Sequence, residues 1–131
     1  MQVLVQVQAK EVKTNLMSYH EIIGWEKGMD LIVEIYQVTK KLPDSERFGL
    51  FQQMRRSATS IPSNIAEGYG RTTRPDFARF VDIALGSARE LQTQLEICKR
   101  LNYFDSTELI GRTEEVARIL YGLGKSLRND N

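Results

Sequence analysis

The stretch FARFVDIALGSARELQTQLEICKRL, residues 77–101, decides the fold of this chain. Its apolar residues recur every three or four positions for about seven helical turns, from Phe77 to Leu101. The charged residues lie mostly between them, which gives a long helix with one apolar face. Pro75 suits a first helical position, and Asn102 favours a stop. We therefore expect a helix over residues 75–102.

Two further helices are expected upstream of this stretch. Between residues 22 and 42 the apolar residues form two helical stripes, one at positions 22, 25, 29, 32 and 36 and another at 31, 35, 38 and 42. Pro43 ends this helix, and Asp44 or Ser45 can cap the next one, expected over 45–67. Pro62 interrupts that helix, but the apolar phase continues beyond it, so we expect a bend there.

A fourth helix is expected downstream, over residues 106–127, because Asp105 followed by Glu108 resembles a capping box. Gly68 and Gly70 are expected to supply positive φ angles in the turn before residue 75. Short connections favour antiparallel neighbours, so we predict an all-α, up-down-up-down four-helix bundle over residues 19–128. Residues 1–18 are expected to form an extension, either strand-like or disordered, because valine alternates with glutamine in residues 1–9. The compact domain is expected to start near Met17.

The composition fits one ordinary globular domain, with 131 residues, 41% hydrophobic and 27% charged. No apolar run reaches the length of a membrane span, and the N-terminus lacks the signal-peptide pattern, so we expect a cytoplasmic protein without a membrane partner. A single cysteine, Cys98, excludes a cysteine-based zinc site within one chain. We expect no metal, no cofactor, no small-molecule substrate and no catalytic residue.

The net charge is only +1, so any affinity for nucleic acid must be local. The candidate surface is a set of arginines that share the middle of the chain: Arg55, Arg56, Arg71, Arg74 and Arg79. Arg71 and Arg74 follow two glycines just before a helix N-terminus, as in anion-binding loops. The alternatives are a solvated interhelical turn and an edge that contacts polyanions.

A second group of residues is expected to act structurally. Asn64, Glu67 and Glu90 lie at the borders of apolar stripes, where burial requires partners such as Arg56, Ser60 or Ser87. We predict a hydrogen-bonded network that fixes helix register, and Gly86 marks a smooth flank for another helix. The whole structural motif comprises Ser60, Pro62, Asn64, Glu67, Gly68, Gly70, Gly86, Ser87 and Glu90.

Residues 60–71, SIPSNIAEGYGR, together with 77–80 and 83–90, carry a family resemblance. The chain resembles the bacterial four-helix bundle proteins encoded in intervening sequences of 23S ribosomal RNA genes. More distantly it is similar to accessory proteins of diversity-generating retroelements, which work with nucleic acid and are strongly basic, unlike this chain. The resemblance implies a helical bundle, a ring-like homo-oligomer of five copies and no enzymatic activity.

Two functions are compatible with the sequence. The first is a non-enzymatic, homo-oligomeric assembly or scaffold protein, because two apolar stripes on one helix cannot both face the core of a single bundle. The alternative is a nucleic-acid-binding accessory factor that contacts RNA or DNA through the arginine set. We expect such binding to be weak, sequence-independent and strongly salt-dependent.

Overall fold

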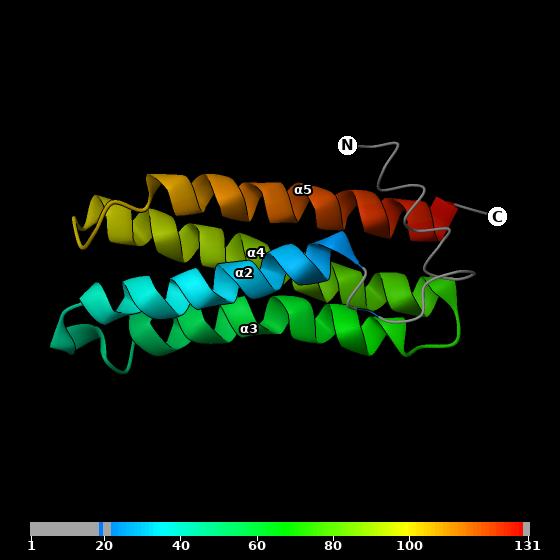
Figure 1. Cartoon of the computed structure of the whole chain (residues 1–131), viewed down its shortest axis with the longest axis horizontal. Coiled ribbons are helices and arrows are strands. Elements are labelled where there is room, and N and C mark those ends of the chain that lie inside the picture. The colour runs from blue at the N-terminus through cyan, green and yellow to red at the C-terminus, as the bar shows by residue number, and fades with distance from the viewer. Residues whose placement is uncertain (1–18, 20–21, 130–131) are drawn as a thin grey trace.

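The protein is described by a computed structural model that covers Tyr19 and residues 22–129. Figure 1 shows a bundle of four helices, and no strand occurs in this part of the chain. The helices are α2 (Ile23–Val38), α3 (Leu50–Tyr69), α4 (Arg74–Arg100) and α5 (Thr107–Asn129), with two 3-10 helices, η2 (Thr39–Lys41) and η3 (Asp44–Glu46), between α2 and α3. The predicted all-α four-helix fold is confirmed. The predicted extension over 1–18 lies outside the described residues.

Side-chain contacts pair neighbouring helices in opposite directions. Ser57 and Ser60 of α3 contact Glu90 and Ser87 of α4, in that order, so residue numbers rise on one helix as they fall on the other. In the same way, Arg128 near the end of α5 forms an ion pair with Asp82 in the first half of α4. Helix α2 packs against α3 and α5, which leaves α4 diagonally across the bundle from α2.

The core consists of the apolar face of each helix. Helix α2 contributes Leu31 and Ile35, which belong to one of its two predicted stripes. Its other stripe is divided, because Ile22 is fully buried in the core and Trp25 and Ile32 pack against it, whereas Met29 and Tyr36 are exposed. The largest fully buried side chains of the other helices are Met54, Ile61, Ile65, Phe77, Leu91, Leu95, Ile119, Leu120 and Leu123. The outward-facing residues of α2 therefore present apolar side chains at the surface of the described chain.

The start of α3 differs from the prediction. Residues 44–46 form η3, and α3 begins only at Leu50, so neither Asp44 nor Ser45 caps it. The cap comes instead from a glutamate side chain, because an Oε1 of Glu46 accepts the backbone N–H of Leu50 at 3.2 Å. Helix α3 then continues through Pro62, which is buried, to Tyr69. The prediction that Pro62 does not end the helix is confirmed.

The glycines of the α3–α4 turn do not act as predicted. The φ angle of Gly70 is −76°, and no glycine of the described chain has a positive φ. Gly68 is instead a point of close approach, because a Cβ there would lie 2.8 Å from Phe77 Cδ1 and 2.8 Å from Phe80 Cβ. Helix α4 begins one residue before Pro75, and Thr73 caps it by accepting the Asp76 N–H at 3.2 Å.

Asn102 ends α4 as predicted, and it does so through a positive φ of 60°. The N–H of Tyr103 donates to the carbonyl of Cys98 at 3.0 Å, and the N–H of Asn102 donates to that of Lys99 at 3.1 Å. This pair of bonds is a Schellman motif, in which asparagine is an accepted substitute for glycine. Beyond it, Asp105 accepts from the backbone N–H and the hydroxyl of Thr107, rather than pairing with Glu108 in the predicted capping box.

Candidate functional site

The five arginines predicted to contact nucleic acid form two separate groups. Arg55 and Arg56 lie near the start of α3, whereas Arg71, Arg74 and Arg79 surround the turn between α3 and α4. About fifteen residues of helix separate the groups, which corresponds to about 22 Å along the helix axis. The structure therefore does not bring these arginines together into one patch.

At the α3–α4 turn, two of the arginines share one carboxylate. The Nε of Arg79 lies 3.1 Å from Asp76 Oδ1, and the Nε of Arg71 lies 3.8 Å from Asp76 Oδ2. Arg71 also pairs with Glu67 at 3.0 Å, and both guanidinium groups stack on Phe80, with their Cζ atoms 4.5–4.6 Å from the ring centroid. The positive charge of this turn is thus largely balanced within the chain.

The remaining three predicted arginines differ in their environments. Arg74 donates from an Nη to the carbonyl of Ser126 in α5 at 3.3 Å, which ties the turn to the end of the chain. The guanidinium of Arg55 lies between the rings of Tyr36 and Phe51, with its Cζ 4.1 and 4.0 Å from their centroids. Arg56 is exposed on α3 and forms no ion pair with the described residues.

Polar side chains connect α3 to α4 along one seam. Ser57 donates to an Oε1 of Glu90 at 2.7 Å, and the hydroxyls of Ser60 and Ser87 lie 2.7 Å apart. The side-chain amide of Asn64 donates to the hydroxyl of Ser60 at 2.9 Å. This seam contains most of the predicted network, but Glu67 and Arg56 are exposed and lie outside it. Gly86 is also exposed, and a Cβ there would meet nothing within 4 Å.

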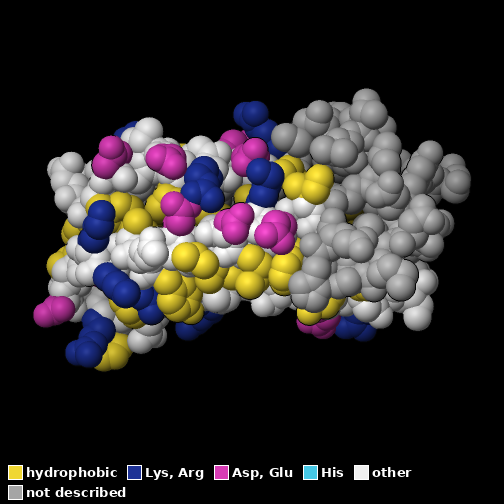
Figure 2. All heavy atoms as spheres, viewed as in Figure 1, with side chains coloured by type: hydrophobic (Ala, Val, Ile, Leu, Met, Phe, Trp, Pro, Cys, Tyr) yellow, Lys and Arg dark blue, Asp and Glu magenta, His cyan; other side chains and the backbone are white. Residues whose placement is uncertain are grey.

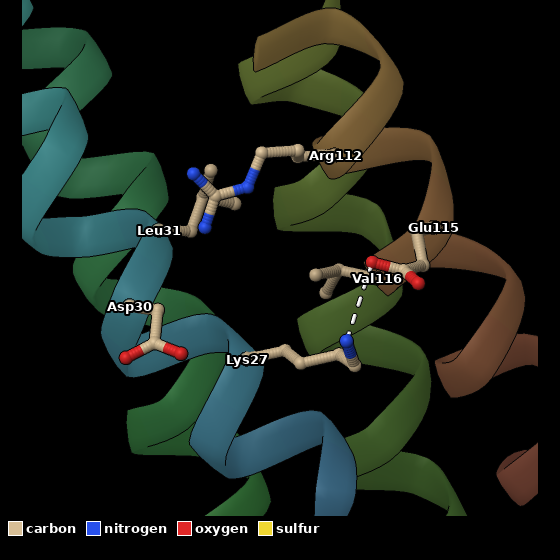
Figure 3. Close-up of a pocket in the computed structure, with 6 residues that line it drawn as sticks. All are labelled: Lys27, Asp30, Leu31, Arg112, Glu115 and Val116. Carbon is tan, nitrogen blue, oxygen red and sulfur yellow. Dashed lines mark hydrogen bonds and ion pairs between the residues drawn. The ribbon is translucent and has the colours of Figure 1, made fainter. Parts of the chain in front are cut away.

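The seam between α2 and α5 is more open, and Figure 3 shows the side chains that line a hollow there. The hollow has a volume of about 60 Å³. Lys27 and Glu115 point toward each other across it, 3.4 Å apart, and Arg112 pairs with Glu34 nearby. The volume is far below the roughly 300–1,000 Å³ of pockets that take small molecules. The hollow therefore has room for water and not for a substrate.

The groups with shifted pKa values have structural causes. Hydrogen bonds from Gln92, Arg89 and Arg118 lower the pKa of Glu114 to about 2, which makes this carboxylate a link between α4 and α5. Burial raises the pKa of Cys98 to about 11, so its thiol, 3.7 Å from the sulfur of Met54, is not a nucleophile at neutral pH. Within the described residues, no group of three or more histidine, cysteine or carboxylate side chains could hold a metal ion.

An apolar groove runs between α2 and α3 on the outer surface. Its volume is about 310 Å³, and its lining includes Trp25 and Met29 of α2 and Pro62 and Ala66 of α3. Further along α2, Val33 is 57% exposed and Tyr36 is 38% exposed. Figure 2 shows hydrophobic side chains gathered along the middle of this face, over α2 and α3, beside a row of charged side chains. We call the groove and the exposed stripe of Met29, Val33 and Tyr36 the α2–α3 apolar surface.

The fold and these surfaces define a class of protein: an all-α four-helix bundle with an external apolar surface. Residues 20–122 match the sequence profile of the 23S rRNA-intervening sequence protein family. The chain belongs to this family, as its motifs predict. No helix in the described part of the chain is both long and apolar enough to cross a membrane.

A solved relative has the same fold. It is a protein of unknown function from the S23 ribosomal protein family of Bacteroides thetaiotaomicron, with 28% sequence identity and a TM-score of 0.71. The match covers 79% of this chain and 96% of the relative. None of the curated proteins compared with the chain matches it. The family and this relative are thus of unsettled function, and neither is described as an enzyme.

Proposed function

We propose that this protein is a non-enzymatic scaffold that assembles with copies of itself through the α2–α3 apolar surface. The observation that carries the proposal is the exposure of three large apolar side chains along the outer face of α2. Met29, Val33 and Tyr36 are between 38% and 57% exposed, beside an apolar groove. Contiguous exposed apolar side chains of this kind mark interfaces more often than free surface.

A second exposed surface supports a ring over a simple pair. On α4, Ile83 is 43% exposed and Ile97 is 39% exposed, with Gly86 between them and open space above it. Because α4 lies diagonally across the bundle from α2, the two surfaces face different directions. Two different contact surfaces on one subunit allow head-to-tail contacts, which form a ring where the rotation between neighbouring subunits closes and an open filament where it does not. Five copies are the number that the family resemblance implies.

Trp25 allows a direct test, because it is the only tryptophan in the chain and it lines the apolar groove. Dilution of the protein should shift its fluorescence emission to longer wavelength as the subunits separate and water reaches the indole. Val33→Lys should show the shifted emission at every concentration, with an unchanged helical circular dichroism signal. Tyr121→Lys, at a 58% exposed position on α5, is the matched control and should behave as the wild type does.

An emission spectrum of the wild type that is independent of concentration, and identical in Val33→Lys, would contradict self-assembly through this surface. A shift in the Tyr121→Lys control equal to that of Val33→Lys would place the contact elsewhere.

Nucleic-acid binding is the alternative function. The arginines of the α3–α4 turn do not favour nucleic-acid binding at this turn, since Arg71 and Arg79 already form ion pairs with Glu67 and Asp76. A different part of the surface favours it more.

A further inference from the structure

Basic residues without ion pairs gather at one end of the bundle. Along the sides of the bundle, ion pairs engage most of the arginines, as between Arg89 and Glu114 or Arg118 and Glu114. In the connection between α2 and α3 the situation differs, because Lys40, Lys41 and Arg47 form no ion pair with the described residues. Arg56, nearly two turns into α3, also forms no ion pair with the described residues. Figure 2 shows basic side chains gathered at the end where Figure 1 draws this connection.

The same connection presents an aromatic ring to solvent. Phe48 is 82% exposed, more than any other large hydrophobic residue described. The turn that carries it is held in place, because Glu46 accepts from the N–H of Leu50 at 3.2 Å and from the hydroxyl of Tyr103 at 2.8 Å. An exposed ring on a fixed turn loses little conformational freedom when a ligand stacks on it.

A second aromatic element lies beside this turn. The Arg55 guanidinium is held between Tyr36 and Phe51, and it donates to the hydroxyl of Thr39 at 3.0 Å and to the carbonyl of Tyr36 at 3.0 Å. These contacts join the end of α2 to the start of α3. They fix the two helix ends that flank the connection carrying Lys40, Lys41 and Arg47.

We propose that this end binds single-stranded nucleic acid, with a base stacked on Phe48 and phosphates on the surrounding cations. We call Lys40, Lys41, Arg47, Phe48 and Arg56 the Phe48 surface. Single-strand binding proteins combine these two elements, because every base has a stacking face and every nucleotide has a phosphate. The inference deepens the alternative function named above and does not depend on self-assembly.

An anionic membrane is the other kind of partner that basic side chains around an exposed aromatic ring can bind. Only one ring on this surface is strongly exposed, and a bilayer would also meet the exposed carboxylate of Asp44 in the same connection. A flexible strand can pass beside that carboxylate, whereas a flat charged surface cannot avoid it. The side-chain arrangement therefore favours a strand over a lipid surface.

The test is a titration of the full-length protein with fluorescently labelled polyuridine oligonucleotides, followed by anisotropy at low and at physiological salt. Phe48→Ala should weaken binding about 5- to 150-fold, which is the range for loss of one stacked base. Tyr121→Ala, which removes an exposed ring on α5, is the matched control and should leave the affinity unchanged.

The cations are tested by the salt dependence. Lys40→Gln combined with Lys41→Gln should lower the slope of log affinity against log salt by about 1.4, since each phosphate contact on a single strand contributes about 0.7. Lys125→Gln, at an exposed lysine of α5 without an ion pair in the described chain, should leave the slope unchanged.

Three results would overturn the inference. The first is an equal affinity of Phe48→Ala and wild type for the oligonucleotide, or an absence of binding by the wild type at low salt. The second is a Phe48-dependent binding of phosphatidylserine vesicles without binding of polyuridine. The third is a loss of binding that occurs only together with a lower assembly mass of the Phe48→Ala protein in light scattering. This mass measurement also separates failure of the inference from failure of the self-assembly proposal.

Discussion

Gly68 is the residue that decides how closely α3 and α4 meet at their shared turn. A methyl group there would lie 2.8 Å from two phenylalanine carbon atoms and 3.2 Å from the carbonyl oxygen of Phe77, a backbone atom that cannot rotate away. Gly68→Ala should therefore lower the free energy of unfolding by about 1–3 kcal/mol, measured by urea denaturation.

Gly86→Ala is the control for that measurement. It should raise the free energy of unfolding by up to about 1 kcal/mol, because the position is helical and has open space around it within the chain. A Gly68→Ala protein as stable as Gly86→Ala would show that the two helices do not meet as described.

Asn102 is a second residue whose backbone limits its replacement. Its φ of 60° strains most side chains, whereas glycine and asparagine tolerate it. Asn102→Gly should keep the midpoint of thermal unfolding or raise it, and Asn102→Ala should cost about 1–2 kcal/mol. Equal thermal midpoints for the two variants would contradict the Schellman geometry at the end of α4.

Glu114 makes the stability depend on pH at the acidic end. Its folded pKa of about 2 lies below the ordinary value of 4.5, so its stabilising effect is complete above about pH 4.5 and is lost as the pH falls toward 2. Glu114→Gln should be less stable than the wild type at neutral pH, and this difference should shrink near pH 2. A difference in unfolding midpoint that stays constant with pH would contradict this role.

At the scale of the helices, sequence periodicity predicted the four elements but not all of their ends. The spacing of the apolar residues was sufficient to predict α4, because the helical repeat sets each of its core positions. The start of α3 was not predictable, because it depends on Glu46, whose carboxylate is shared with the distant Tyr103. The role of Gly68 was also missed, since close approach to Phe77 depends on tertiary packing and leaves no mark in a local pattern.

The seam between α3 and α4 carries the prediction that belongs to this scale. Ser87→Ala removes the partner of the Ser60 hydroxyl and should cost about 0.5–1.5 kcal/mol in urea denaturation. Ser63→Ala, which removes only a local bond from an exposed hydroxyl to the carbonyl of Thr59, should change the stability by less than about 0.5 kcal/mol. If both substitutions have the same effect, the seam does not contribute to helix register.

At the scale of the whole molecule, the sequence predicted the excess apolar surface better than the charged one. The two stripes on α2 predicted apolar side chains outside the core, and the structure leaves Met29 and Tyr36 of these stripes exposed, together with Val33, which belongs to neither stripe. The predicted partner copy stays a prediction. The arginine set was chosen by proximity in sequence, which does not reveal that Asp76 lies between Arg71 and Arg79 or that Arg55 is stacked. The exposure of Phe48 depends on the fold of the α2–α3 connection, so no pattern in the sequence singled it out.

The central claim is that this bundle assembles with copies of itself, and the molar mass of the wild type in solution tests it most directly. Multi-angle light scattering at micromolar concentration should return a multiple of the 15.0 kDa chain, and five copies would weigh about 75 kDa. Met29→Lys combined with Val33→Lys should return the mass of a single chain with its helical signal intact. A wild-type mass of 15.0 kDa at every concentration would contradict the account.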